Sequence, residues 1–305
     1  MLQLSGEVKK MKDYAIISYA YNKTIRIYVA SSTNLVEEAR RIHNTWPTAT
    51  AALGRFLTVS AMMGLMYKNE EKLTLRIKGD GPIGMMLVEA NSKGEVRGEI
   101  QNPNVYLKYE EGPKKGKLNV GGAVGNGFLH VTKDLLMKDY FTSSSELQTG
   151  EIGDDFTYYF ALSEQIPSSV GVGVLVNIDQ TVLASGGYIL QVMPECREET
   201  IGEVERIIQT IPPMSTLIQE GKTPEEILTI LAQGTEQILR KSDISYTCNC
   251  SKDGFIKSLS ALDEDTLHEI IHEDEKAEIE CHFCGKKYLF SKEELEKIQV
   301  NRKLK

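Results

Sequence analysis

The sequence predicts an α+β protein: an N-terminal mixed sheet-and-helix domain, a helical connector and a small C-terminal zinc-binding module. Three observations predict this division. Short apolar segments separated by glycine-rich turns run through residues 1–185 and indicate strands with helices among them. Residues 186–240 change to charged helices, and residues 241–305 hold four of the five cysteines. At 305 residues the chain exceeds the usual span of one hydrophobic core.

The composition limits the function. Hydrophobic residues make up 41% and charged residues 26%, as in ordinary globular protein, while the net charge is −8. An acidic balance argues against bulk nucleic-acid binding and against docking on an anionic membrane. The dense basic run Lys114-Lys115-Gly116-Lys117 is short and is interpreted as a solvated turn.

Targeting signals are not evident. The longest apolar stretch, Val170–Ile178, is far shorter than the roughly 18 residues of a membrane-spanning helix. Met1–Glu7 lacks the charged start and apolar core of a signal peptide. We therefore expect a cytoplasmic protein, in which thiols are kept reduced.

In the N-terminal domain the patterns predict a hairpin, two helices and several further strands. The hairpin turns at Asn22-Lys23. Helices are expected at Thr33–Asn44 and Thr48–Tyr67, the second beginning at Pro47 and burying one face. That face carries Ala51, Leu53, Phe56 and Leu57. Strands are expected at Tyr14–Ala20, Ile25–Ala30, Leu73–Lys78, Met85–Glu89, Val96–Ile100, Lys117–Val120, Gly127–Val131, Asp155–Leu162 and Val170–Val176.

Two glycine motifs resemble nucleotide sites without meeting their requirements. Residues Gly79–Gly84 fit G-x-G-x-x-G, but a dinucleotide site needs a helix next, and Met85–Glu89 is strand-like. We interpret this motif as a hairpin turn. Gly121–Gly127 lacks the Lys-Ser/Thr end of a P-loop and is expected to be a loop, and no G-x-S-x-G elbow is present. The sequence thus predicts neither nucleotide binding nor an enzyme.

The connector contains amphipathic helices. One face carries Ile201, Val204, Ile207, Ile208 and Ile211, and Pro212-Pro213 must end that helix. Thr223-Pro224-Glu225-Glu226 begins another helix, which ends near Gly234 and carries Ile227, Leu228, Ile230 and Leu231. We expect this apolar stripe to cover apolar surface of the N-terminal domain.

The cysteine module has the spacing of a metal site. Cys248 and Cys250 form one pair and Cys281 and Cys284 another, and four thiolates satisfy a tetrahedral zinc ion. The second pair joins two predicted strands, Glu278–Glu280 and Tyr288–Phe290, through a tight turn at Gly285. Ser251, Asp263 and Ser291 are predicted helix caps. Structural zinc supplies about 10–16 kcal/mol to such small sites, so losing it should unfold the module.

A competing motif lies inside the module. His268-Glu269-Ile270-Ile271-His272 is a literal H-E-x-x-H, the pattern of zinc proteases. We favour a short surface helix that buries Leu267, Ile270 and Ile271, because the module is too small to support a protease site. The surroundings are acidic: Asp263, Glu264, Asp265, Glu273, Asp274 and Glu275.

Together these features resemble the heat shock protein 33 family of redox-regulated holdase chaperones. The resemblance covers nearly the whole chain and ends on the C-x-C and C-x-x-C pairs at the family's spacing. The motifs that carry it are Trp46–Arg55, Gly79–Gly84, Gly121–Gly127, Gly150–Tyr159, Val170–Val174 and the four cysteines.

The resemblance implies an ATP-independent chaperone of the cytoplasm that is inactive while reduced and zinc-bound. It places one zinc ion on Cys248, Cys250, Cys281 and Cys284, and implies that oxidation forms the disulfides Cys248–Cys250 and Cys281–Cys284. The oxidised protein would then dimerise and hold unfolding clients, without nucleotide, nucleic acid or membrane. Cys196 is outside this pattern and is interpreted as an incidental thiol. A thiol–disulfide oxidoreductase using the same cysteines is the alternative.

Overall fold

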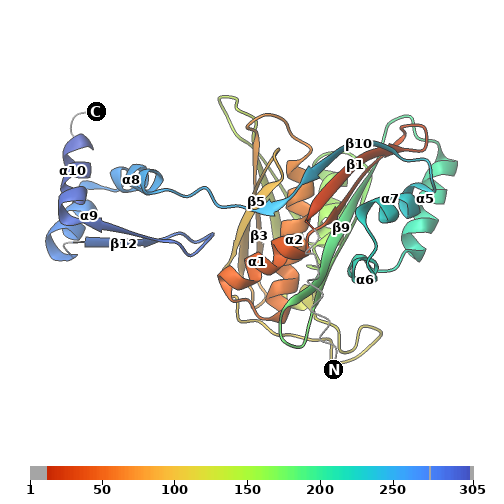
Figure 1. The fold of residues 1–305 in the computed structure, drawn as a ribbon, viewed down its shortest axis with the longest axis horizontal. Coiled ribbons are helices and arrows are strands. Elements are labelled where there is room, and N and C mark those ends of the chain that lie inside the picture. The colour runs from red at the N-terminus through yellow and green to blue at the C-terminus, as the bar shows by residue number, and fades with distance from the viewer. Residues whose placement is uncertain (1–11, 275, 303–305) are drawn as a thin grey trace, which may run out of the picture. The chain divides into compact units, whose positions relative to one another are not determined.

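The computed structural model describes residues 12–274 and 276–302, which form two compact units (Figure 1). The first unit ends at Thr247 and the second begins at Cys248. Two predictions fall on residues outside the described part of the chain. One is the lack of a signal peptide at Met1–Glu7, and the other is the placement of Glu275 among the acidic residues around the H-E-x-x-H motif. The division at residues 185/186 and 240/241 stays a prediction. Within the described residues, no helix is both long and apolar enough to cross a membrane.

The first unit contains a five-stranded antiparallel sheet. β1 and β2 form the predicted hairpin, with Asn22 and Lys23 at positive φ in its turn. The sheet includes two strands that the sequence patterns did not predict, β9 and β10, and β10 pairs with β1 at one edge. In spatial order the strands are β10 (Gln237–Asp243), β1 (Tyr14–Ala20), β2 (Ile25–Ser31), β9 (Val182–Val192) and β8 (Ser168–Val176).

A six-stranded sheet forms the second layer. Its neighbours are antiparallel except for β11, which runs parallel to β5. The Gly79–Gly84 motif joins β3 to β4, so the prediction of a hairpin turn is confirmed. In spatial order the strands are β11 (Ser245–Tyr246), β5 (Glu95–Ile100), β4 (Met85–Asn91), β3 (Lys72–Gly79), β6 (Gly127–Asp134) and β7 (Phe141–Glu146).

Helix α2 (Pro47–Gly64) packs against both sheets, with α1 (Thr33–His43) beside it (Figure 1). The prediction that α2 buries one face was too narrow. All of its residues except Pro47 and Arg55 are buried, because strands β8 and β9 contact it from one sheet and β4 and β5 from the other. A helix enclosed in this way has little use for a polar face.

Two predicted strands are wrong. Residues 155–162 belong to helix α4 (Gly153–Leu162), which buries Phe156, Tyr159 and Phe160 at helical spacing. The aromatic residues favour strands locally, but Asp155 caps the helix by accepting backbone hydrogen bonds from Gln148, Thr149, Gly150 and Ile152.

The segment 117–120 and the glycine motif after it also differ from expectation. Leu118 makes only an isolated bridge to Lys108. The motif contains a short helix, α3 (Val120–Val124), rather than a loop. The Asn119 side chain accepts a hydrogen bond from the Gly122 backbone N–H at 2.7 Å and so fixes the start of that helix.

The connector helices α5 (Glu198–Thr210), α6 (Met214–Gln219) and α7 (Pro224–Ala232) cover the face of the five-stranded sheet that α2 does not contact (Figure 1). This confirms that most of the apolar stripe packs on the N-terminal sheet, although Ile201 and Ile230 are not part of that core. Gly173 and Gly186 permit the close approach of α6, because a Cβ at either position would crowd Ser215 or Ile218. The connector side chains in this core are Val204, Met214, Leu217, Ile227, Leu228, Leu231 and Ala232, with Ile207, Ile208, Ile211 and Ile218 partly buried.

The second unit is a small α+β module. It consists of one β-hairpin and short helices on both sides of it in the chain. In chain order the elements are α8 (Lys252–Ser260), α9 (Glu264–Glu269), a π-helical turn (Ile270–Asp274), β12 (Lys276–Glu280), β13 (Lys287–Ser291) and α10 (Lys292–Arg302). Ser251, Asp263 and Ser291 accept the capping hydrogen bonds that the sequence predicted. Its core is Leu259, Leu267, Ile271, Tyr288, Phe290, Leu295 and Ile298.

Candidate metal centre

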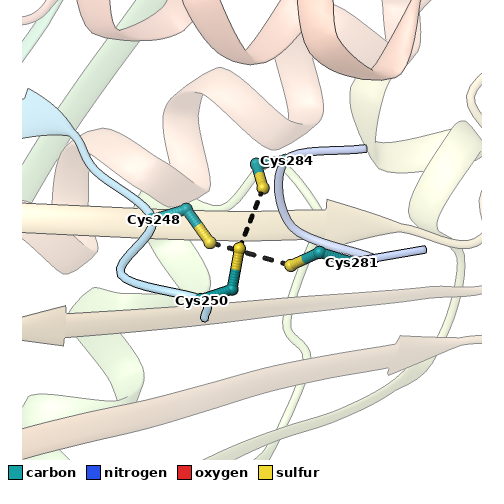
Figure 2. Close-up of side chains that lie close together, drawn as sticks. All are labelled: Cys248, Cys250, Cys281 and Cys284. Atoms are coloured by element: carbon teal, nitrogen blue, oxygen red, sulfur yellow. Dashed lines mark hydrogen bonds between the residues drawn. The ribbon is translucent and has the colours of Figure 1, made fainter. Parts of the chain in front are cut away.

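Four cysteine side chains converge at one end of the β12–β13 hairpin (Figure 2). The Sγ atoms of Cys248, Cys250, Cys281 and Cys284 all lie within 4.8 Å of one another. Cys248 Sγ lies 3.7 Å from Cys281 Sγ, and Cys250 Sγ lies 3.4 Å from Cys284 Sγ. Across the described part of the chain this is the one group of His, Cys, Asp or Glu side chains placed to hold a metal ion.

Local backbone structure positions the second pair. The Cys281 N–H donates to Lys286 O at 3.0 Å, and the N–H groups of Cys284 and Gly285 both donate to Cys281 O. Gly285 has φ +68°, which side chains rarely adopt, so the glycine permits the turn that points both sulfur atoms the same way. The predicted tight turn at Gly285 is therefore confirmed.

The first pair lies on extended chain between β11 and α8 and is held by β13. The Tyr288 hydroxyl lies 3.3 Å from Cys250 Sγ and 3.0 Å from Cys250 O, so its one proton is within hydrogen-bonding distance of both atoms. Tyr288 also packs against Phe255 with ring centroids 5.1 Å apart. The sequence pattern predicts a strand at Tyr288 but no role for this residue at the site. Its position four residues after Cys284 was the available signal.

The cluster fits the donor set of zinc. A tetrahedron of sulfur atoms about 2.3 Å from a central ion has edges of about 3.8 Å, close to the Cys248–Cys281 separation of 3.7 Å. Each thiol donates one soft ligand, and structural zinc sites are commonly closed by four of them. The second unit has only seven buried core residues, and natural scaffolds this small often add a structural metal to a limited core.

The thiols differ in acidity. Burial raises the pKa of Cys281 and of Cys284. Burial acts in the same direction on Cys250, but hydrogen bonds from Tyr288 and from the other three cysteines outweigh it and lower its pKa to about 7. One sulfur of the cluster is thus stabilised as a thiolate by donors around it, which is the form that binds metal and reacts with oxidants.

The H-E-x-x-H segment does not form a second metal site. Leu267 and Ile271 are fully buried while His268 and His272 are exposed, with ring centroids 4.1 Å apart. The helix also changes to π-helical geometry at Ile270, in the middle of the motif. The two histidines therefore lie on a solvated surface, as the sequence analysis favoured.

Cys196 lies in the first unit and is not part of the cluster. It is partly buried against the connector core, and its Sγ donates weakly to Arg197 O at 3.8 Å. It has no disulfide. This placement agrees with an incidental thiol.

Comparison with known proteins places this architecture in one family. The family described as Hsp33 protein matches residues 13–291. The chain belongs to the Hsp33 family. It is 56% identical over 288 residues to the 33 kDa chaperonin of Acholeplasma laidlawii, covering 94% of this chain and 99% of that protein. The 33 kDa chaperonin of Bacillus velezensis is 50% identical, with 94% and 98% covered.

A solved structure supports the same assignment. The crystal structure of the 33 kDa chaperonin from Thermotoga maritima superposes with a TM-score of 0.87 at 33% identity. The match covers 96% of this chain and 99% of that one. Membership of the Hsp33 family therefore rests on sequence and fold together.

Proposed function

We propose that this Hsp33 family member is a redox-regulated, ATP-independent holdase of the cytoplasm. It binds unfolding proteins when oxidised and needs no nucleotide, nucleic acid or membrane. The observation that carries the proposal is the convergence of the four cysteine Sγ atoms within 4.8 Å in a unit with a small core. Such a unit depends on what its cysteines bind, so cysteine chemistry controls whether it is folded.

In the reduced state we assign one zinc ion to Cys248, Cys250, Cys281 and Cys284. When bound, zinc would hold the four sulfur atoms as thiolates and add about 10–16 kcal/mol to the stability of the unit. That is as large as the whole stability of a typical domain, about 5–15 kcal/mol. The unit is therefore expected to unfold when its thiolates are consumed.

Oxidation converts the cysteines to two disulfides. Two equivalents of hydrogen peroxide take four electrons and four protons from four thiols, forming two S–S bonds and four water molecules. We assign the bonds to Cys248–Cys250 and Cys281–Cys284. The closest sulfur contacts of the folded unit join the two pairs instead, but those partners are 33 and 34 residues apart in the chain. Once the unit unfolds, only partners two or three residues apart stay close.

The connector carries the signal to the first unit. From Cys248 the chain leads back through β11 and β10 to α7, and β11 pairs with β5 over only two residues. Unfolding that spreads along this path would detach α5–α7 from the sheet. The exposed face would include Ile16, Ile25, Ile27, Val29 and Leu190, which are buried at present. An apolar surface of this kind binds unfolding clients and supports dimerisation.

The test combines zinc content with client aggregation before and after peroxide. We expect one equivalent of zinc in the reduced protein, lost on oxidation as aggregation of a thermally unfolding client is suppressed. Cys281→Ser should abolish regulated zinc release, whereas the matched variant Cys196→Ser should behave as the wild type. Disulfide mapping by mass spectrometry checks the pairing.

Two results would contradict the proposal. Zinc that stays bound through oxidation while clients aggregate would make the metal purely structural. Catalytic turnover of a dithiol substrate by a unit that remains folded would favour a thiol–disulfide oxidoreductase.

A further inference from the structure

A cavity of about 990 Å³ lies in the first unit, at the start of helix α2. It is bounded by the beginning of α2, the loop that precedes α3, strand β8 and the beginning of α6. Its volume is at the upper end of the range for small-molecule sites, roughly 300–1,000 Å³. None of its lining residues belongs to the cysteine cluster, so it is separate from the site described above.

Much of the lining is apolar. Strand β8 contributes Val172, Val174 and Val176. Two aromatic side chains, Trp46 and Tyr106, also line the cavity and remain 45% and 52% exposed. A ligand with an apolar body would bind favourably here, because it would remove exposed aromatic and aliphatic surface of the cavity from water.

The charged residues of the lining are mostly basic. Within the described part of the chain, Arg55, Lys108, Lys114 and Lys117 line the cavity together with one carboxylate, that of Glu151. Four positive charges against one negative charge leave an excess of three, in a chain whose net charge is −8. The cavity is therefore locally complementary to an anion although the whole chain is acidic.

The single carboxylate is already fully engaged. Glu151 accepts hydrogen bonds from the Tyr109 hydroxyl and Arg55 Nη1, both at 2.5 Å, and from Lys114 Nζ at 3.3 Å. Burial opposes its ionisation, but these donors outweigh burial and lower the pKa of Glu151. Glu151 thus neutralises part of the charge on Arg55 and Lys114 and offers nothing to the remaining cations.

Two cations of the lining remain available. Among the described residues, Lys108 and Lys117 are exposed and have no carboxylate partner, and Lys108 Nζ lies 5.0 Å from the centre of the Tyr106 ring. An anionic group in the cavity is the kind of partner that would pair with both ammonium groups.

We propose that this cavity binds a small, soluble amphipathic anion, with an apolar body and a phosphate or carboxylate group. The apolar body packs along β8 and the aromatic side chains, and the anionic group pairs with the free cations. The proposal is independent of the redox switch, because every residue it uses lies in the first unit and none of them is a cysteine.

The chain supplies its own reporter. Trp46 is the only tryptophan in the sequence, so ligand binding can be followed by tryptophan fluorescence of the full-length reduced protein. The probe is octyl phosphate, which is optically silent, and titration calorimetry measures the same affinity. Matched probes are octanol, octylammonium and inorganic phosphate. We expect octyl phosphate to bind most tightly, with an affinity that falls as salt is raised.

A pair of variants tests the residues. Lys108→Gln with Lys117→Gln removes two exposed charges and should weaken octyl phosphate binding about three- to tenfold. Lys23→Gln with Lys138→Gln removes two exposed lysines outside the cavity and should leave binding unchanged. Trp46→Phe should abolish the fluorescence signal while calorimetry still detects binding.

Three results would overturn the proposal. One is binding of octanol or octylammonium as tight as that of octyl phosphate. Another is equal loss of affinity in the two double variants. The last is binding to anionic phospholipid vesicles without binding to dissolved octyl phosphate, which would indicate a lipid surface instead. None of these binding measurements uses zinc content or client aggregation, so they can be interpreted even if the proposed redox switch proves wrong.

Discussion

The Tyr14 hydroxyl donates a hydrogen bond of 2.5 Å to the Glu225 carboxylate, although 211 residues separate them. Tyr14 begins β1 and Glu225 lies in the first turn of α7, so the bond fastens the connector to the sheet. Glu225 also pairs with Lys241 of β10. Burial opposes its ionisation, but Lys241 and Tyr14 outweigh burial and lower the pKa of Glu225. The contact therefore joins the three elements that the proposed switch must separate.

Tyr14→Phe should loosen α7 without changing its packing. Because the carboxylate is partly exposed, we expect a loss of about 1 kcal/mol, which corresponds to roughly fivefold faster hydrogen exchange in residues 224–232. Tyr19→Phe on the same strand is the control, since within the described residues its hydroxyl makes no hydrogen bond. Equal exchange in the two variants would show that the bond does not hold α7.

Leu228→Ala tests whether the connector cover restrains activity. Leu228 is fully buried against the sheet, so truncation should destabilise the docked connector by about 2–5 kcal/mol. We expect the reduced variant to suppress client aggregation without peroxide. Leu239→Ala, at a position 55% exposed, is the matched control and should stay inactive until oxidised. A stable, inactive Leu228→Ala protein would mean that the cover does not restrain activity.

Glu151→Gln should produce a pH-dependent loss of stability. Its pKa is lowered in the folded state, so the carboxylate contributes stability above its unfolded value near 4.5. We expect the variant to lose about 1–3 kcal/mol at pH 7, with the difference shrinking as the pH falls through the lowered pKa. Denaturant unfolding at several pH values measures this. Glu110→Gln, at an exposed position, is the control, and a pH-independent difference would contradict the assignment.

Asp155→Asn tests the cap that turns residues 153–162 into a helix. The carboxylate accepts four backbone hydrogen bonds at 2.7–3.2 Å and is fully buried. Loss of its charge, and of acceptor capacity at one oxygen, should cost about 2–3 kcal/mol and lower Tm by several degrees. The neighbour Asp154 is exposed, so Asp154→Asn should change Tm little. Equal Tm values for Asp155→Asn and Asp154→Asn would show that the Asp155 cap does not stabilise the helix.

Removal of the proposed zinc ion by a chelator should unfold the second unit and loosen the connector. The second unit is expected to lose hydrogen-exchange protection because its core is small, β10 and α5–α7 should lose part of theirs, and the interior strands of the six-stranded sheet should keep theirs. Retention of protection in both units would show that the module is stable without metal. Cys196→Ser should not alter the result.

Local sequence patterns predicted most of the elements around the candidate site. The helix caps at Ser251, Asp263 and Ser291 join residues three positions apart, so they can be predicted from local sequence. The spacing of the cysteines likewise predicts a metal site. The patterns missed β7, β9, β10 and β11. For β10 the reason is clear, because its pairing with β1 joins residues over 200 positions apart. They also missed Tyr288 beside Cys250 and the cavity near Trp46, which depend on distant segments meeting.

Neighbouring residues along the chain were sufficient to predict the two cysteine pairs, the turns at Gly79–Gly84 and Gly285 and most of the apolar stripe of the connector. The helix at residues 155–162 depends on tertiary packing as well as on its local cap, because Phe156, Tyr159 and Phe160 are buried at helical spacing in the core of the first unit, against the strand preference of aromatic residues. Tertiary packing likewise buries α2 on nearly all sides and, among the described residues, brings four lysine and arginine side chains and one carboxylate into the lining of a single cavity. Burial and charge environment arise only when distant segments pack together, so local sequence propensity does not predict them.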